Sequence, residues 1–307
     1  MSFIPNIFPI FKKITEDDCA IFKKITDLYP PYSDYNFTSM WCFNTNNEIE
    51  YSFLHDNLVV KFQDYTENKY FYSFFGTNKI EQTVNTLLVK AANENMLHAL
   101  KLLPEDNFTS IYNSFPDFLI LEDPDNFDYI LSIWEIEKMA GSKYYDKRNL
   151  VNRFNRYLPQ ASFQELDLSD KLIQKRIIDL WKLWELTAQM TQYERENELK
   201  AFMGLLSSQM ITTNSIRTFG IYNQERLIGF SINEIIDRQY ILMHFEKADH
   251  LYPGIYSYLK KNVAQAFHKE NYKFINYEQD LGIEGLRKAK RLWHPISYLK
   301  KYIISPK

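Results

Sequence analysis

One stretch of the sequence, residues 240–302, limits the possible folds more than any other. It opens with an apolar run of strand length at residues 240–245, and a Pro253-Gly254 turn follows. Apolar residues then recur at every fourth position from residue 255 to residue 267, which predicts a helix. A second strand is predicted at residues 274–278. Two strands joined by one helix pair in parallel, so both deliver their carboxyl ends to the same edge of the sheet.

Four polar side chains are expected to converge at that edge, where ligands commonly bind. Side chains alternate along a strand, so His244 and Glu246 should share one face of the first strand, and Asn276 and Glu278 one face of the second. Polar groups that end two neighbouring strands are typical of a site, although both strands could instead end in a solvated loop. We therefore take Glu278, Glu246 and His244 as candidate catalytic residues and Asn276 as a candidate substrate-binding residue.

Four sequence blocks spread over most of the chain carry a resemblance to a known family. The last block contains HFEKAD at residues 244–249, YEQDLG at 277–282 and GLRKAK at 285–290; the earlier blocks are KRN at 147–149, RF at 153–154 and DYNF at 34–37. Together they resemble the phosphatidylglycerol lysyltransferase C-terminal domain family. That family is similar to tandem acyltransferase folds of the GNAT type, and it includes domains that move lysine or alanine from charged tRNA to lipid. The resemblance implies two GNAT-like domains and an acyl transfer reaction.

The sequence departs from the family pattern at positions that bear on the substrate. Tyr277 stands where the family often has arginine, and Leu292-Trp293 replaces a common Ser-Tyr pair. The GNAT-type loop that binds pyrophosphate, usually rich in glycine and basic residues, is reduced here to residues 250–254. Coenzyme A is for that reason the less favoured co-substrate.

The pattern of elements predicts an α+β fold with two domains, each a mixed, mostly antiparallel sheet flanked by helices. With 307 residues and 45% hydrophobic content, the chain is long enough for both. We predict an N-terminal domain at residues 1–140, a connecting basic helix at 141–160 and a C-terminal domain at 161–307 that carries the site. The predicted elements, in order, are a hairpin meander at 48–76, a helix at 79–96, strands at 118–121 and 129–134, helices at 170–190 and 194–210, a second meander at 217–245, the helix and strand described above, and a last strand near Tyr302.

Charge and cysteine content limit the class of protein. A net charge of −3 and a pI near 6.1 argue against a general nucleic-acid or membrane-surface protein, so any tRNA contact must be local. Two cysteines are too few for a disulfide scaffold or a zinc site. We expect a cytoplasmic protein with no transmembrane segment, because the uncharged stretch at 202–216 is too short to span a bilayer.

The chemistry of such a transferase needs no tightly bound cofactor and no metal. An amine or hydroxyl acceptor must lose a proton while the acyl carbonyl gains negative charge, so a carboxylate and backbone N–H donors suffice. The sequence offers no Ser-His-Asp or Cys-His arrangement, and His244 with Glu246 is a weak metal pair without a third ligand. The acceptor could be a small molecule, a peptide or a lipid headgroup.

Two acyl donors remain open as co-substrates. Aminoacyl-tRNA would need a basic path and a carboxylate pocket for the ammonium group, and acyl-CoA would need a helix N-terminus for its pyrophosphate. The candidate cofactor-binding residues are Gly254, Ile255, Arg287, Lys288 and Lys290, and the further candidate substrate-binding residues are Asp280, Lys147, Arg148 and Arg153. The basic residues after Gly282 could equally form a solvated helix face, with Ile283, Leu286, Ala289 and Trp293 pointing inward.

Aminoacyl transfer is slightly favoured on these grounds. An acyl-CoA-dependent N-acyltransferase is the alternative enzyme, and a non-catalytic regulatory or binding protein built on the same fold is the alternative from another class.

Overall fold

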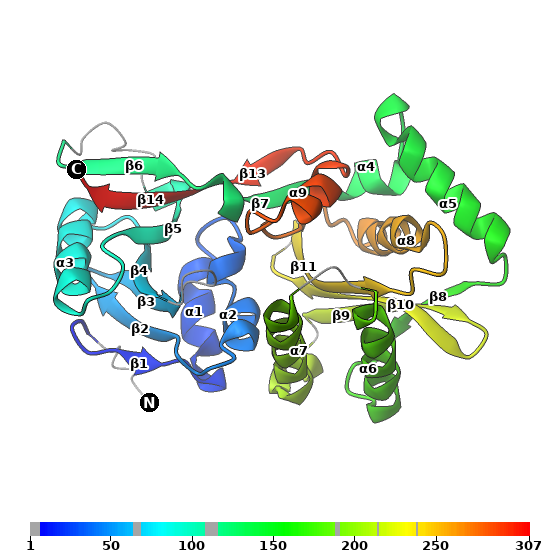
Figure 1. Cartoon of the computed structure of the whole chain (residues 1–307), viewed down its shortest axis with the longest axis horizontal. Coiled ribbons are helices and arrows are strands. Elements are labelled where there is room, and N and C mark those ends of the chain that lie inside the picture. Colours follow the sequence, from blue (N-terminus) through cyan, green and yellow to red (C-terminus); the bar gives the residue numbers. More distant parts are fainter. Residues whose placement is uncertain (1–6, 64–68, 108–115, 188–190, 214, 238) are drawn as a thin grey trace. The chain divides into compact units, whose positions relative to one another are not determined.

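The structure is a computed structural model that describes residues 7–63, 69–107, 116–187, 191–213, 215–237 and 239–307. Two compact units divide the chain. Unit 1 contains Met1–Asp128, Gln279–Ile283 and Leu299–Lys307, and unit 2 contains Tyr129–Glu278 and Glu284–Tyr298. Each unit is built around a mixed sheet that has seven strands in the described residues (Figure 1). The predicted α+β class, with two mixed sheets flanked by helices, is confirmed.

The sheet of unit 1 follows the predicted meander and adds a parallel strand. Its strand order is β1-β2-β3-β4-β5-β14-β6, in which β2 to β4 are antiparallel neighbours and β4 pairs with β5 in parallel. The strands are β1 (Lys12–Lys13), β2 (Glu50–Leu54), β3 (Asn57–Gln63), β4 (Tyr70–Phe75), β5 (Leu100–Pro104), β6 (Phe118–Glu122) and β14 (Lys301–Pro306). The α-helices are α1 (Cys19–Thr26), α2 (Phe37–Phe43) and α3 (Ile80–Asn93), and short 3-10 turns lie at Glu16–Asp18, Ser33–Tyr35, Glu105–Asn107 and Pro124–Asn126.

Helices cover both faces of the unit 1 sheet because alternate residues of its strands are apolar on both sides. The face with Tyr72 and Phe74 packs on α3, whose buried residues include the predicted stripe Val84, Leu87, Leu88 and Ala91. The opposite face packs on α1, where the ring of Phe22 lies 5.0 Å from that of Tyr51. Burial on two faces explains why these strands read as nearly continuous apolar runs.

Unit 2 is built around the strand–helix–strand that the sequence predicts. Its strand order is β13-β7-β12-β11-β10-β9-β8, and β11 pairs with β12 in parallel. The strands are β7 (Asp128–Ser132), β8 (Ser162–Leu166), β9 (Ile216–Asn223), β10 (Arg226–Ile235), β11 (Tyr240–Ala248), β12 (Phe274–Asn276) and β13 (Ser297–Leu299). The helices are α4 (Ile133–Lys138), α5 (Tyr145–Tyr157), α6 (Lys171–Glu185), α7 (Gln192–Ser207), α8 (Ile255–Lys269) and α9 (Glu284–Arg291), with 3-10 turns at Ser142–Tyr144 and Gln209–Thr212.

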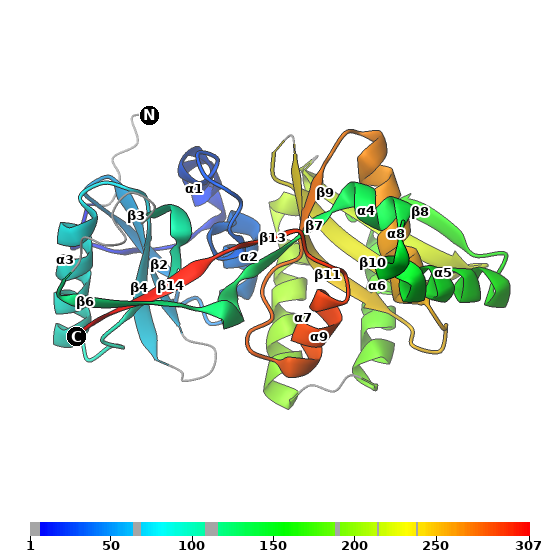
Figure 2. The ribbon, with the colours of Figure 1, turned by 90° about the horizontal axis from the view of Figure 1, so that it is seen from above.

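The unit 2 sheet lies between two layers of helices. Helices α4, α5 and α8 cover one face, and α6 and α7 cover the other (Figure 1; Figure 2). On the first face, α8 buries the predicted stripe Ile255, Leu259, Val263 and Phe267. On the second face, Trp181 of α6 stacks on Phe202 of α7 with ring centroids 4.6 Å apart. The Trp181 ring is therefore a core residue, as its helical spacing indicates.

Three features of the observed division differ from the predicted domain ranges. The strand predicted at 129–134 is β7, which joins the sheet of unit 2 rather than that of the N-terminal half. The last strand, β14, lies between β5 and β6 in the sheet of unit 1. The predicted connecting helix is α5, and it packs into unit 2 through Val151 and Phe154. Local patterns predict that a strand or helix forms, but not which sheet offers it a partner.

Within the part of the chain that the structure describes, none of the helices combines the length and the apolar character that crossing a membrane requires.

Candidate functional site

Strand β11 of unit 2 runs past its parallel partner. It pairs with β12 only at Tyr240, Ile241 and Leu242, and it continues for six more residues to Ala248. Strand β12 ends at Asn276, and its chain then turns at Glu278, whose φ is 55°. The Asn276 Oδ1 accepts the Glu278 backbone N–H at 2.8 Å and fixes this turn. The two strands are therefore splayed, and beyond Leu242 this edge of β11 has no ladder partner among the described residues, although the Ala248 backbone N–H donates to the Tyr256 hydroxyl at 3.2 Å.

A β-bulge at His244 changes the direction of the side chains along that edge. In the pairing of β10 with β11, Ile232 stands opposite Phe245 but Asn233 stands opposite Met243, so His244 is an extra residue. Met243 belongs to the core under α8, whereas Phe245 packs on the other face against Trp181 of α6.

The prediction that His244 and Glu246 share a face is therefore wrong. His244 reaches Glu234 of β10, and Glu246 reaches Lys260 of α8. An extra residue in a strand reverses the alternation for everything that follows it, and no local pattern announces it.

His244 is buried between two carboxylates. Its Nε2 lies 2.9 Å from Glu234 Oε2, and its Nδ1 lies 3.7 Å from Glu278 Oε1. Burial alone lowers the pKa of His244, but the hydrogen bond to Glu234 and the negative charges of Glu234 and Glu278 outweigh burial and raise the pKa to about 9. At neutral pH His244 is thus a cation that holds both carboxylates in place. The side chain of Glu278 is 21% exposed, compared with 8% for Glu234, so Glu278 is the member that a substrate can reach.

Glu246 pairs with a lysine that sequence reasoning missed. Lys260 of α8 is fully buried, and its Nζ lies 2.9 Å from Glu246 Oε2 and 3.7 Å from the centroid of the Tyr277 ring. Burial lowers the pKa of Lys260, and Glu246 opposes that shift. Lys260 is adjacent to Leu259 but is not part of the predicted apolar stripe of α8. The spacing of the apolar residues therefore did not predict that Lys260 is buried.

Two further lysines meet aromatic rings around the same pair. The Nζ of Lys147 lies 4.3 Å from the centroid of the Trp293 ring, and that of Lys290 lies 4.8 Å from the Tyr277 ring. Lys290 also donates to the backbone carbonyl of Tyr277. Partial burial and the positive charge of Lys260 lower the pKa of Lys147 to about 8. We call Lys147, Lys260, Lys290, Tyr277 and Trp293 the lysine–aromatic cluster.

Most of the other predicted site residues of unit 2 pack against the protein or form hydrogen bonds within it. A Cβ on Gly254 would overlap the carbonyl oxygen of Leu150 in α5, and φ is 86° there, so close helix packing requires a glycine at this position. Ile255 is buried in the core. Arg148 donates to the carbonyls of Met139 and Gly141 at the end of α4, while Arg153 is exposed.

Helix α9 differs from the amphipathic helix that the sequence predicts. Of the four residues expected to point inward, Trp293 is buried, Leu286 is half-buried, and Ile283 and Ala289 are exposed. Arg287, a candidate cofactor-binding residue, is half-buried. Lys290 is buried in their place, whereas Lys288 is exposed. The inward placement of Ile283 and Ala289, which was one of two alternatives, is therefore wrong. Lys290 is buried instead, where its ammonium donates to the Tyr277 carbonyl and lies over the Tyr277 ring.

Asp280 lies in unit 1, where its Oδ1 accepts the Gly282 backbone N–H at 2.9 Å. The structure thus places His244, Glu278 and Asn276 in one group and Glu246, Lys147 and Lys290 in a second group of unit 2, and it places Asp280 in neither.

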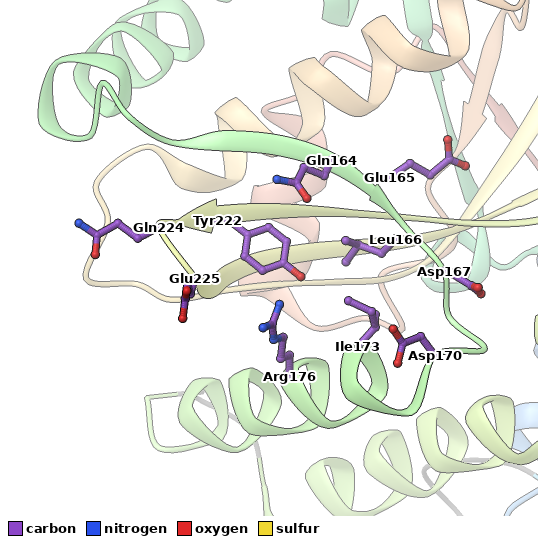
Figure 3. Close-up of a pocket in the computed structure, with 10 residues that line it drawn as sticks. All are labelled: Gln164, Glu165, Leu166, Asp167, Asp170, Ile173, Arg176, Tyr222, Gln224 and Glu225. Carbon is purple, nitrogen blue, oxygen red and sulfur yellow. The ribbon is translucent and has the colours of Figure 1, made fainter.

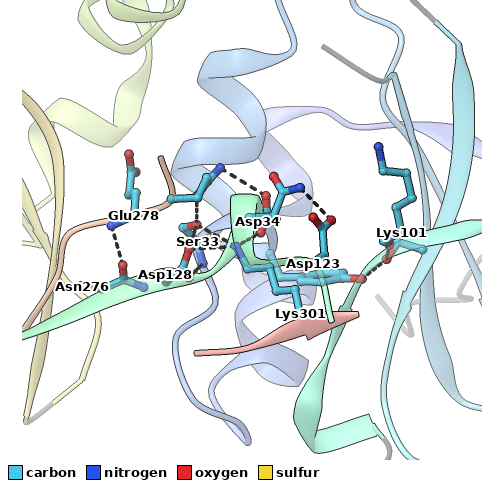
Figure 4. Close-up of polar contacts among 12 residues, drawn as sticks. Ser33, Asp34, Lys101, Asp123, Asp128, Asn276, Glu278 and Lys301 are labelled. Carbon is cyan, nitrogen blue, oxygen red and sulfur yellow. Dashed lines mark hydrogen bonds and ion pairs between the residues drawn. The ribbon is translucent and has the colours of Figure 1, made fainter. Parts of the chain in front are cut away.

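Unit 1 contains a separate buried polar cluster, shown in Figure 4. Lys301 is fully buried, forms an ion pair with Asp34 and lies 2.8 Å from Asp128 Oδ1. The Oγ of Ser33 donates to Asp128 at 2.6 Å. Burial raises the pKa of Asp34 to about 6 even though Lys301 opposes the shift. The DYNF block therefore supplies a structural ion pair, and Gln279 of the YEQDLG block lies within 3.4 Å of Asp34.

In the residues that the structure describes, no group of three or more histidine, cysteine, aspartate or glutamate side chains is arranged to hold a metal ion.

Comparisons with known proteins match nearly the whole chain. A family model described as "Phosphatidylglycerol lysyltransferase, C-terminal" matches residues 26–305. A conserved protein of unknown function from Bacteroides thetaiotaomicron is similar, with 23% identity and a TM-score of 0.81 over 97% of this chain and 99% of that one. No curated protein matches the chain.

Two solved structures related to the same family show a more distant likeness. One is the C-terminal DUF2156 domain of a protein described as a lysylphosphatidylglycerol synthetase from Agrobacterium fabrum, with 12% identity and a TM-score of 0.61 over 94% of this chain and 91% of that one. The other is L-PGS from Bacillus licheniformis, with 12% identity and a TM-score of 0.62 over 97% of this chain and 93% of that one. At these identities the likeness establishes the fold.

Proposed function

Because the chain belongs to the phosphatidylglycerol lysyltransferase C-terminal family, we propose that it is an aminoacyltransferase whose site lies along the open edge of β11 in unit 2. Membership in this family supports an acyltransferase, and the family name supports an aminoacyl group as the cargo and a lipid headgroup as an acceptor. The site would take aminoacyl-tRNA as donor and an amine or a hydroxyl as acceptor.

The observation that carries the proposal is the splay of β11 from β12. Six residues of β11 extend beyond the last pair of this parallel ladder, next to Glu278 and the His244 bulge. A strand edge without a ladder partner can bind an extended ligand through its backbone groups. Such a ligand would bring its acyl carbonyl next to a carboxylate that is itself held by a buried cation.

The transfer step follows from these groups. The acceptor N–H or O–H gives its proton to the Glu278 carboxylate as its lone pair attacks the acyl carbon. The new C–N or C–O bond forms, the ester bond to the donor breaks, and the proton passes from Glu278 to the oxygen that leaves. His244 touches Glu278 rather than the reacting atoms, so it acts as a positioning residue that neutralises and orients the carboxylate.

The lysine–aromatic cluster supports an anionic donor through Lys147, its half-buried lysine. The Lys147 ammonium lies over the Trp293 ring, whereas Lys290 and Lys260 are buried and bond to the Tyr277 carbonyl and to Glu246. Positive charge on aromatic surfaces favours phosphates and nucleobases, both of which the end of a tRNA carries. The packing of Gly254 against Leu150 at the start of α8 gives that glycine a structural role and weakens the case for a pyrophosphate site there.

An assay with separate donors tests the proposal. The full chain is incubated with lysyl-tRNA or alanyl-tRNA and phosphatidylglycerol vesicles, and in parallel with acetyl-CoA and an amine. We expect transfer from at least one aminoacyl-tRNA and loss of about 10²-fold to 10⁴-fold in turnover in Glu278→Gln, as for other general bases. The matched control is Glu185→Gln, a half-buried glutamate at the end of α6, which should leave turnover unchanged.

Transfer from acetyl-CoA without transfer from either aminoacyl-tRNA would replace aminoacyl transfer by the acyl-CoA-dependent alternative. A Glu278→Gln variant that turns over normally would remove Glu278 from the site.

A further inference from the structure

Unit 2 contains a pocket that lies outside the proposed transfer site. It is an open pocket with a volume of about 520 Å³ between β8, the turn that joins β9 to β10, and helix α6 (Figure 3). Strand β8 is the edge strand of the sheet, and β9 and β10 separate it from β11. None of the candidate site residues described above lines this cavity. Its volume suits a small molecule.

Three carboxylates in the wall are already committed to structural bonds. The Oε2 of Glu165 accepts from Arg217 at 2.8 Å. Asp167 accepts the backbone N–H of Ser169 at 2.9 Å, and Asp170 caps α6 by accepting the Leu172 N–H at 2.7 Å. These side chains form part of the wall and give it negative charge, but their hydrogen bonds to the protein make them poor candidates for ligand binding.

Three other lining groups have no hydrogen bond or ion pair from their side chains within the described residues. The ring of Tyr222 is largely buried, since the residue is only 4% exposed, and Tyr222 lines the pocket. The guanidinium of Arg176 reaches up from α6 and lies 5.7 Å from the centroid of the Tyr222 ring. Glu225 is exposed at the turn between β9 and β10. Figure 3 shows Arg176 pointing toward Tyr222, with Glu225 to one side.

The chemistry of these three groups defines a ligand. The Tyr222 hydroxyl belongs to the wall of the pocket, where it is free to donate a hydrogen bond to a bound molecule. A guanidinium binds a carboxylate through two parallel N–H groups, and Tyr222 can add a third donor. A ligand with only a negative charge would be repelled by the four carboxylates of the lining and attracted by a single arginine. A ligand with only a positive charge would leave Arg176 without a partner.

We propose that this pocket binds a free α-amino acid as a zwitterion, with its carboxylate on Arg176 and Tyr222 and its ammonium on Glu225. The site is independent of the transfer reaction, because it uses different strands and different side chains. Amino acid binding in this pocket can therefore be tested separately from the proposed transfer activity.

Calorimetric titration of the full chain with single L-amino acids tests the proposal, with no tRNA or lipid present. For each amino acid that binds, the matched probes lack one charge: for alanine they are propionate, which keeps only the carboxylate, and ethylamine, which keeps only the ammonium. We expect at least one amino acid to bind and each of its one-charge probes to bind at least tenfold more weakly. Absence of binding for all twenty amino acids at millimolar concentration would overturn the proposal, as would a carboxylate probe that binds as tightly as the amino acid.

Variants of the three groups locate the binding. Arg176→Met keeps most of the side-chain volume and should weaken binding at least tenfold, and Tyr222→Phe and Glu225→Gln should each weaken it several-fold. The control is Lys182→Met, which removes an exposed charge from the same helix and should leave binding unchanged. Melting temperatures of all four variants show whether they fold. Unchanged affinity in a folded Arg176→Met variant would overturn the assignment of the pocket.

Discussion

His244 shows how far a single residue depends on its surroundings. Free histidine is mostly neutral at pH 7, and burial should make it more so, yet Glu234 and Glu278 raise the pKa of His244 to about 9. The side chain is therefore unsuited to accept a proton at neutral pH. Its position at a bulge, which aims it away from Glu246, gives it two carboxylate partners at once.

The raised pKa predicts a pH dependence of stability. A group whose pKa is higher in the folded state stabilises the fold fully below its unfolded pKa, and this contribution is lost as the pH rises through the folded value. For His244 the window is pH 6.5 to about 9. A shift of this size corresponds to about 3 kcal/mol of the free energy of unfolding.

Urea unfolding of the wild type and of His244→Gln between pH 6 and pH 10 measures this effect. The difference in stability between the two proteins should be largest near pH 6 and should shrink toward pH 10. The exposed His98→Gln is the control and should differ from the wild type by the same small amount at every pH. Parallel pH profiles for wild type and His244→Gln would contradict the assignment of a cationic His244.

At the scale of elements, the start of α8 is shaped by its contact with α5. Gly254 precedes α8 with a left-handed φ of 86°, and a Cβ there would lie 2.8 Å from the carbonyl carbon of Leu150. The two helices therefore approach so closely that only glycine fits between them. The same glycine suggested an anion site from sequence alone, because glycine before a helix serves both purposes.

Alanine substitutions at two glycines test whether Gly254 is required for helix packing. Gly254→Ala combines a strained φ with overlap against backbone, so it should lower the free energy of unfolding by more than about 1 kcal/mol. Gly285→Ala in α9, where a Cβ meets nothing within 4 Å, should be neutral or raise the free energy of unfolding by up to about 1 kcal/mol. Thermal or urea unfolding compares them. A Gly254→Ala protein of wild-type stability would show that packing does not explain this glycine.

At the scale of the whole molecule, the chain returns to unit 1 after it has built unit 2. Lys301 of β14 meets Asp34 and Asp128, which lie more than 170 residues earlier in the sequence. All three side chains are buried, so water does not solvate their charges. Each charge is therefore stabilised mainly by the opposite charge beside it. This cluster joins the last strand of the chain to the early part of unit 1.

Removing Lys301 should therefore be costly. Lys301→Met leaves two buried carboxylates without their cation, and we expect a loss of about 3 to 5 kcal/mol in the free energy of unfolding. Lys300→Met is the control, since Lys300 is a partly exposed neighbour that pairs with Glu122 at 2.7 Å on the surface, and its loss should cost at most about 1 kcal/mol. A second substitution, Asp128→Asn, should recover part of the stability of Lys301→Met. Equal stability of Lys301→Met and Lys300→Met would contradict a buried ion cluster.

Local sequence patterns were enough to predict many of the helices and strands and the α+β class of this protein. Period-two and period-four apolar patterns predicted both meanders, the parallel pair around α8 and the buried stripe of α3, because burial on one face imposes a local period. The resemblance of four sequence blocks predicted the family, and strand ends predicted that Glu278 and His244 would come together.

The pairing of those elements with one another depends on contacts that form only in the folded chain. The bulge at His244, the buried charges of Lys260 and Lys301 and the return of β14 to the first sheet each depend on groups far away in the sequence. A lysine is buried where a carboxylate or an aromatic ring meets it, and a strand joins the sheet whose edge is free. The local sequence shows neither where a lysine is buried nor which sheet a strand joins. Both depend on contact energies between residues that only the fold brings together.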